Sequence, residues 1–267
     1  MGEPDLNSIV GRSDIVLLVL DTLRYDVAQS LHLEGRTSNL GRYLGPSGWE
    51  LRHSPATFTY AAHHAFFAGF LPTPALPGKH PRLFAAAFEG SETTTDRTWV
   101  FEQATLPQAL AARGYRTICA GGVGFFNERT ALGRVLPNLF QASRWCPEFS
   151  VVDRESTRHQ FAWVASELGE TAGPAFVFVN VSAIHQPNRG YVDGKAHDDL
   201  ESHAAALCYV DSQIPRLFDA LRARGEAFVI VTSDHGTAYG EDGFFGHRCA
   251  HRTVFEVPYA HFQLEPA

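Results

Sequence analysis

Short apolar runs recur along the 267-residue chain, and stretches with helical periodicity separate them. Four runs have the length of a β-strand: 15–20 (IVLLVL), 116–120 (RTICA), 175–180 (AFVFVN) and 227–232 (AFVIVT). Because these runs are continuously apolar, they are typical of strands buried on both faces of a parallel sheet. Helices are predicted over 105–115, 153–170 and 198–226, with Pro215 as a point where the last can kink or divide. Strands and helices in this alternation predict an α/β fold with a mainly parallel sheet.

Side chains that commonly bind metal ions follow the first, third and fourth of these runs. They are, in chain order, Asp21, His185, Asp234 and His235. Because ligands bind at the carboxyl ends of the strands in open α/β sheets, we expect these side chains to meet at one edge. Adjacent carboxylate and imidazole groups are common ligands of zinc and related ions. The alternative is structural, since an aspartate directly after a strand also caps helices.

Residues 57–72 (TFTYAAHHAFFAGFLP) read as a short buried helix that starts near Thr59 and ends at Gly69. Free backbone N–H groups and the helix dipole at such a start attract an anion. A hydroxyl there can act as a nucleophile when a metal ion lowers its pKa. A purely capping role for Thr59 is the alternative, and it is compatible with catalysis.

Composition and charge narrow the class of protein. Hydrophobic residues make up 45% and charged residues 19%, which is ordinary for a globular protein. The net charge of −7 disfavours nucleic acid and anionic membranes as partners, so a phosphorylated substrate would need local cations such as a metal ion. The N-terminus does not resemble a signal peptide, and the run 15–20 falls short of the roughly 20 residues that span a bilayer. The four scattered cysteines form no C-x-x-C pair, so we expect a cytoplasmic protein without disulfides.

Three motifs in chain order resemble the alkaline phosphatase and sulfatase superfamily. They are VLLVLDTLRYD (16–26), TFTYAAHHAFFAGFLP (57–72) and VIVTSDHGTAYGEDGFFGH (229–247), the last followed by VPY. The resemblance implies a three-layer sandwich with a mainly parallel central sheet, in one domain over 1–267 that lacks the usual C-terminal subdomain. It also implies that Asp21, Asp234 and His235 bind a metal ion. The nucleophile of this superfamily lies ten residues before the helix-ending glycine, which selects Thr59.

The motif around Thr59 departs from that of the sulfatases. Sulfatases carry a cysteine or serine in C/S-x-P-x-R, which is converted to formylglycine, whereas this chain has T-Y-A-A-H. An unmodified threonine resembles the phosphodiesterase and phosphoethanolamine-transferase branches. The resemblance therefore implies a divalent ion, zinc with manganese or calcium as alternatives, bound by Asp21, Thr59, Asp234 and His235.

Four further histidines are candidates for substrate or metal contacts by the same resemblance. His63 stands where sulfatases have an arginine, so it either donates to a substrate oxygen or is a buried helix histidine. His185, in SAIHQPN, and His247, in EDGFFGH, are candidates to protonate the leaving group. His251 is a substrate-contact or ligand candidate, or it faces a helix groove. Whether a second ion binds stays open, with His185, His247 and His251 as its candidate ligands.

These residues predict a metal-dependent hydrolase or transferase acting on a small phosphoester or phosphonate. Two alternatives stay open: a sulfate-ester or sulfonate hydrolase that works without formylglycine, and a non-catalytic metal-binding scaffold protein. No nucleic-acid or membrane partner is expected, and a homo-oligomer is left open. Arg24 is expected to brace the site rather than bind substrate. Glu241 and Asp242 are expected to shape the turn before His247 and to remain solvated.

Overall fold

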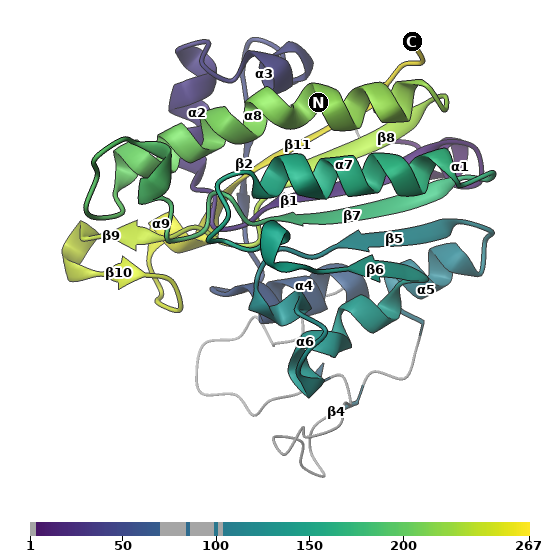
Figure 1. Ribbon diagram of the computed structural model, residues 1–267, viewed down its shortest axis with the longest axis horizontal. Helices are drawn as coiled ribbons and strands as arrows, with labels where there is room; N and C mark the ends of the chain where they lie inside the picture. The colour runs from purple at the N-terminus through teal and green to yellow at the C-terminus, as the bar shows by residue number, and fades with distance from the viewer. Residues whose placement is uncertain (1–3, 70–83, 86–98, 101–103) are drawn as a thin grey trace.

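The computed structural model describes residues 4–69, 84–85, 99–100 and 104–267. Seven strands of this part of the chain form one sheet in the order β2-β11-β8-β1-β7-β5-β6 (Figure 1). Their bounds are β1 Asp14–Leu20, β2 Glu50–His53, β5 Arg116–Ala120, β6 Ala142–Arg144, β7 Ala175–Val181, β8 Ala227–Thr232 and β11 Glu256–Leu264. Strand β11 is antiparallel to both of its neighbours, and all other neighbouring strands are parallel. The predicted mainly parallel sheet is therefore confirmed.

The four predicted strands are β1, β5, β7 and β8, and they occupy the interior of the sheet. All seven residues of β7 are buried, which explains why its sequence shows no alternation of apolar and polar residues. Two short ladders lie outside this sheet. They pair β9 (Ala238–Tyr239) with β10 (Phe245–Gly246), and β3 (Phe84–Ala85) with β4 (Trp99–Val100).

Helices cover both faces of the sheet, as the three-layer prediction requires. One face packs against α2 (Tyr25–Leu33), α3 (Ser38–Leu44), α7 (Ser156–Gly169) and α8 (Leu200–Arg222). The other packs against α4 (Thr59–Ala68), α5 (Leu106–Ala111) and α6 (Ala131–Val135). Alternate residues of β1 point to opposite faces of the sheet. Leu18 packs in the core on the α7–α8 side, and Leu17 packs in the core on the α4–α6 side. Figure 1 shows α7 and α8 side by side over the sheet.

The remaining helical segments are short. They are α1 (Leu6–Ile9), α9 (Arg252–Phe255) and the 3₁₀ turns η1 (Gly124–Phe126), η2 (Pro137–Leu139), η3 (Pro147–Phe149), η4 (Arg189–Tyr191) and η5 (Glu241–Gly243). No helix in the described residues is long and apolar enough to cross a membrane. Residues 71–84 (LPTPALPGKHPRLF) are rich in proline, which predicts an irregular loop, but all of them except Phe84 lie outside the described residues.

The three predicted helices exist with shorter bounds, as α5, α7 and α8. Helix α8 is continuous through Pro215, so the proline does not divide it. Proline lacks the N–H that would bind the carbonyl four residues earlier, at Asp211. The side-chain amide of Asn39 donates to that carbonyl oxygen at 3.0 Å instead. A contact from α3 thus replaces the missing helical hydrogen bond.

A candidate metal centre at the carboxyl ends of the strands

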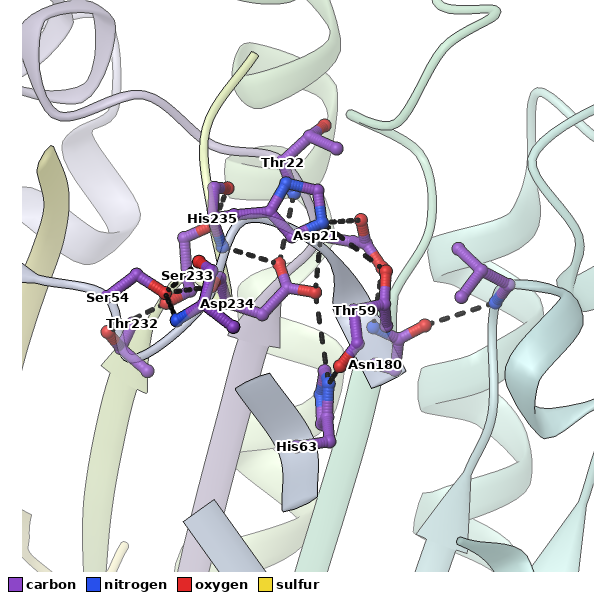
Figure 2. Close-up of polar contacts among 12 residues, drawn as sticks. Asp21, Thr22, Ser54, Thr59, His63, Asn180, Thr232, Ser233, Asp234 and His235 are labelled. Carbon is purple, nitrogen blue, oxygen red and sulfur yellow. Dashed lines mark hydrogen bonds and ion pairs between the residues drawn. The ribbon is translucent and has the colours of Figure 1, made fainter. Parts of the chain in front are cut away.

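Asp21, Asp234 and His235 meet at one edge of the sheet. Asp21 directly follows β1, and the other two follow β8, the parallel neighbour of β1. All three are fully buried, and they offer ligand atoms that lie within 4.8 Å of one another. Figure 2 shows the three side chains converging beneath the turn at Thr22. Within the described part of the chain, no other group of three His, Cys, Asp or Glu side chains is this close.

The two carboxylates have the properties of metal ligands. Asp21 Oδ1 and Asp234 Oδ2 are buried and accept no hydrogen bond. Burial raises the pKa of both carboxyl groups to about 6, and the nearby charge of Asp234 adds to the rise at Asp21. Because buried charges without a partner are unfavourable, these oxygens need either protons or a cation. A divalent cation fits this donor set.

The imidazole of His235 is oriented as a ligand. Its Nδ1 contacts the carbonyl oxygen of Gly236 at 2.9 Å, which places the proton on Nδ1 and the lone pair on Nε2. Nε2 faces the carboxylates, at 3.5 Å from Asp234 Oδ2 and 4.0 Å from Asp21 Oδ1. Burial lowers the pKa of His235, so the ring is neutral at physiological pH. Two oxygen donors and one imidazole nitrogen suit zinc and related ions.

Neighbouring groups orient the remaining carboxylate oxygens. The amide of Asn180, near the end of β7, donates to Asp21 Oδ2 at 2.9 Å. The backbone N–H groups of Thr22 and His235 donate to Asp234 Oδ1 at 3.2 and 3.0 Å. Thr22 does so from φ +64, an unusual conformation for a β-branched residue. Sequence reasoning missed Asn180, although a lone amide at the end of an apolar strand was a usable signal.

Thr59 is the first residue of α4 and lies against this centre. Phe58 is the N-cap, so the capping role considered for Thr59 is wrong. The Thr59 hydroxyl is 3.4 Å from Asp21 Oδ2 and 3.4 Å from His235 Nε2 (Figure 2). Helix α4 ends as predicted at Gly69, which adopts φ +81. The structure thus brings together all four residues predicted to bind the metal ion.

His63 lies behind Thr59, one helical turn further along α4. It is fully buried, and its Nδ1 contacts the Thr59 carbonyl oxygen at 2.7 Å. Burial lowers the pKa of His63 to about 3, so the ring is neutral. The edges of Phe66, Phe126 and Phe178 surround it at 5.4 to 5.5 Å between ring centroids. This environment favours the buried helix histidine over the predicted substrate contact.

His185 and His247 gather next to His235. The His247 ring centroid is 4.6 Å from that of His235 and 5.6 Å from that of His185. The β9–β10 hairpin lies beyond the end of the sheet at which the parallel strands finish (Figure 1), and His247 directly follows β10. Burial lowers the pKa of His247 to about 3, and the charges of His235 and His185 contribute. A neutral His247, whose buried Nδ1 has no hydrogen-bond partner, suits a ligand or hydrogen-bonding role better than a stored proton.

His251 does not join this group, contrary to expectation. Its Nδ1 accepts from the backbone N–H of Thr253 at 3.2 Å and so caps α9. Its Nε2 lies 3.1 Å from Asp242 Oδ2. Both ring nitrogens are therefore engaged by local partners. Of the three histidines considered for a second ion, His185 and His247 are the two that lie in one group with His235.

Arg24 braces the centre as expected. It is 3% exposed, forms an ion pair with Asp26 at 2.6 Å and forms a second, very short one with Glu241. It thereby joins the turn after β1 to the hairpin that carries His247. Glu241 is only 29% exposed and also accepts from the Tyr239 N–H at 2.6 Å, so the expectation that it is merely solvated is wrong. Asp242 is 83% exposed and shapes the turn with φ +50.

Comparison with known proteins assigns the chain to a family. Residues 13–259 match the family described as sulfatase, so the chain belongs to the sulfatase family. Together with the fold, this confirms the resemblance to the alkaline phosphatase and sulfatase superfamily. No match is found among curated proteins.

Solved structures share the fold at low sequence identity. The periplasmic domain of phosphoethanolamine transferase EptC from Campylobacter jejuni is 12% identical, with a TM-score of 0.62 over 95% of this chain and 80% of that one. The corresponding Escherichia coli domain, in complex with zinc, is 15% identical, with a TM-score of 0.63 over 97% and 74%. An alkaline phosphatase superfamily protein from Vibrio parahaemolyticus is 17% identical, with a TM-score of 0.59 over 96% and 62%. The cytoplasmic location expected for this chain stays a prediction.

Proposed function

We propose that this protein is a metal-dependent hydrolase or transferase of phosphoesters or phosphonates, with Thr59 as its nucleophile. The observation that carries the proposal is the position of the Thr59 hydroxyl. It lies at the start of a helix, 3.4 Å from Asp21 Oδ2 and 3.4 Å from His235 Nε2. Membership of a superfamily of hydrolases and transferases supports an enzyme. The zinc complex of one structural relative supports zinc as the ion.

Asp21, Thr59, Asp234 and His235 would hold the divalent ion. When bound, such an ion polarises a phosphoryl oxygen and lowers the pKa of a neighbouring hydroxyl. The chain provides the remaining parts. The Thr59 hydroxyl donates to Asp21 Oδ2, so that carboxylate is positioned to accept the hydroxyl proton.

Attack by Thr59 Oγ on phosphorus forms a phosphothreonine as the bond to the leaving oxygen breaks. The first backbone N–H groups of α4 have no partner within the helix, so they are available to phosphoryl oxygens on which negative charge develops. His185 is the candidate to protonate the leaving oxygen, because the neutral His247 has no proton to spare beyond its ring N–H. Water or an acceptor alcohol then attacks phosphorus and releases Thr59.

The experiment compares Thr59→Ala with Thr57→Ala on the zinc-loaded protein. Thr57 lies two residues earlier, half-buried, and its side chain takes no part in the proposed chemistry. We expect Thr59→Ala to lose at least about 1,000-fold in aryl phosphate turnover while it retains zinc by elemental analysis. Thr57→Ala should keep both. Unchanged turnover in Thr59→Ala would exclude Thr59 as the nucleophile.

A sulfate-ester activity is the second candidate, because the matched family is described as sulfatase. Paired assays on aryl phosphate and aryl sulfate with the same leaving group separate the two activities. We expect faster turnover of the phosphate, since Thr59 replaces the residue that becomes formylglycine. A protein that binds no metal and turns over neither ester would instead be a scaffold.

A further inference from the structure

Arg248 directly follows His247 and adopts a conformation that arginine rarely takes. Its φ is +69, in the left-handed region that glycine and asparagine occupy at lower cost. Its side chain is nevertheless exposed, so no core packing explains an arginine here. Residues held in strained conformations cluster at functional sites, where the surrounding structure maintains them. The position therefore suggests that the side chain itself is used.

Two contacts fix Arg248 beside the nucleophile. Its backbone N–H donates to the carbonyl oxygen of Thr57 at 2.9 Å. Its guanidinium carbon lies 5.3 Å from the ring centroid of Phe58, the residue directly before Thr59. A cation over an aromatic face is held in place while its N–H donors stay available. The guanidinium is thus anchored at the entrance to α4.

The charge of Arg248 is not neutralised by any carboxylate within the described residues. Arg24, by contrast, is paired with both Asp26 and Glu241. The positive charge of Arg248 also reaches the centre, where it adds to burial in lowering the pKa of His235 and of His247. Arg248 is therefore a free cation near the metal ligands in the part of the chain that the structure shows.

The balance of charges around the centre indicates which kind of ligand the cation of Arg248 binds. Asp21 and Asp234 together carry two negative charges when ionised, which a divalent ion would cancel. His235 and His247 are neutral, so these two rings add no positive charge to meet the negative charge of an ester substrate. The guanidinium of Arg248 supplies one. Planar guanidinium groups bind phosphoryl oxygens through two parallel hydrogen bonds.

We propose that Arg248 is a substrate-binding residue whose guanidinium binds an anionic oxygen of the ester that reaches Thr59. The inference rests on the function proposed above and adds a residue to it. The ligand is an oxyanion, phosphoryl in the first instance. Because Arg248 contacts Thr57 and Phe58, its guanidinium would hold the substrate anion close to the start of α4.

The test measures binding and turnover separately, with zinc-loaded protein freed of excess zinc. Calorimetric titration with inorganic phosphate gives a dissociation constant that does not depend on activity. We expect Arg248→Gln to weaken phosphate binding and to raise KM for an aryl phosphate by about tenfold or more, with a smaller change in kcat. Arg248→Lys should recover part of the loss, because lysine keeps the charge without the planar fork.

The matched control is Arg52→Gln. Arg52 also lies over an aromatic ring, 5.0 Å from the Tyr259 centroid, and its side chain is 57% exposed on strand β2. This variant should bind phosphate like the wild type, and thermal unfolding should show that all variants are folded.

Two results would overturn the role of Arg248: phosphate binding in Arg248→Gln equal to that of the wild type, or no phosphate binding by the wild type. The proposed function fails in a different way. If the wild type binds phosphate through Arg248 but turns over no ester, the binding role stands and the catalytic proposal does not. If the wild type is active and Arg248→Gln is equally active with equal affinity, only the role of Arg248 is lost.

Discussion

Replacing Asp234 by asparagine should stabilise the metal-free protein while abolishing its metal site. Burial raises the pKa of Asp234 from 3.8 to about 6, so ionising it costs more in the folded than in the unfolded protein. At 1.36 kcal/mol for each pKa unit, this difference amounts to about 3 kcal/mol. Asparagine keeps the acceptor for the Thr22 and His235 N–H groups. Its new amide group replaces Oδ2, which lies 3.5 Å from His235 Nε2.

The sign of the pH dependence follows from the raised pKa. Between about pH 4 and pH 6 the folded state binds more protons at Asp234 than the unfolded state does, so the metal-free protein loses stability as pH rises. The loss is complete above the folded pKa of about 6. We therefore expect the free energy of unfolding of metal-free Asp234→Asn to exceed that of the metal-free wild type by about 3 kcal/mol at pH 8, and by much less near pH 4.

Urea unfolding of chelator-treated protein at pH 8 and pH 4.5 measures this difference. Asp242→Asn is the control, because Asp242 is 83% exposed and its left-handed φ of +50 suits asparagine. It should change the free energy of unfolding by less than about 0.5 kcal/mol. Added zinc should reverse the order, since it stabilises only the protein that binds it, by about 4 kcal/mol at 1,000 times its dissociation constant. Destabilisation of metal-free Asp234→Asn at pH 8 would refute the reasoning and identify Asp234 as a structural residue.

Three further changes test how the centre and fold are supported. Gly236→Ala places a Cβ 1.9 Å from the backbone oxygen of Thr253, so we expect a lower melting temperature and weaker zinc binding in a titration. A normal melting temperature would contradict this packing. Asn180→Ala removes the donor to Asp21 and should weaken zinc binding by about 10- to 100-fold, measured by competition with a chelator; unchanged affinity would count against it. Asn39→Ala leaves an α8 carbonyl unpaired and should cost about 1 to 3 kcal/mol in urea unfolding, whereas a neutral result would show that water replaces the amide.

The interior of the fold was predictable because burial on both faces leaves a direct mark on the sequence. Each central strand is a continuous apolar run, and β7 is buried at every residue. The edge strands carry no such mark. Strand β2 (ELRH) exposes three of its four residues and reads as a loop, and β6 has only three residues. Their strand conformation depends on pairing with β11 and β5, which the local sequence does not encode.

The candidate metal ligands could be placed for a related reason. In a parallel sheet, the residue after each strand lies at the same edge, so chain order alone brings Asp21 to Asp234 and His235. Roles that depend on side-chain direction could not be placed in this way. His251 is four residues from His247, yet it turns to cap α9 and contact Asp242.

Asn180 and Arg248 show why the supporting residues escaped prediction. An amide inside an apolar strand has no chemistry of its own to attract notice, and its role exists only because Asp21 lies across the β1–β7 pair. Arg248 matters through a backbone angle and a contact with Phe58, neither of which follows from residue type. The groups that would hold a metal ion can thus be predicted from the sequence, because they are metal-binding residue types at the ends of strands. The groups that orient those ligands and bind the substrate are determined by three-dimensional packing, so the variants at Asn180 and Arg248 test what the structure adds.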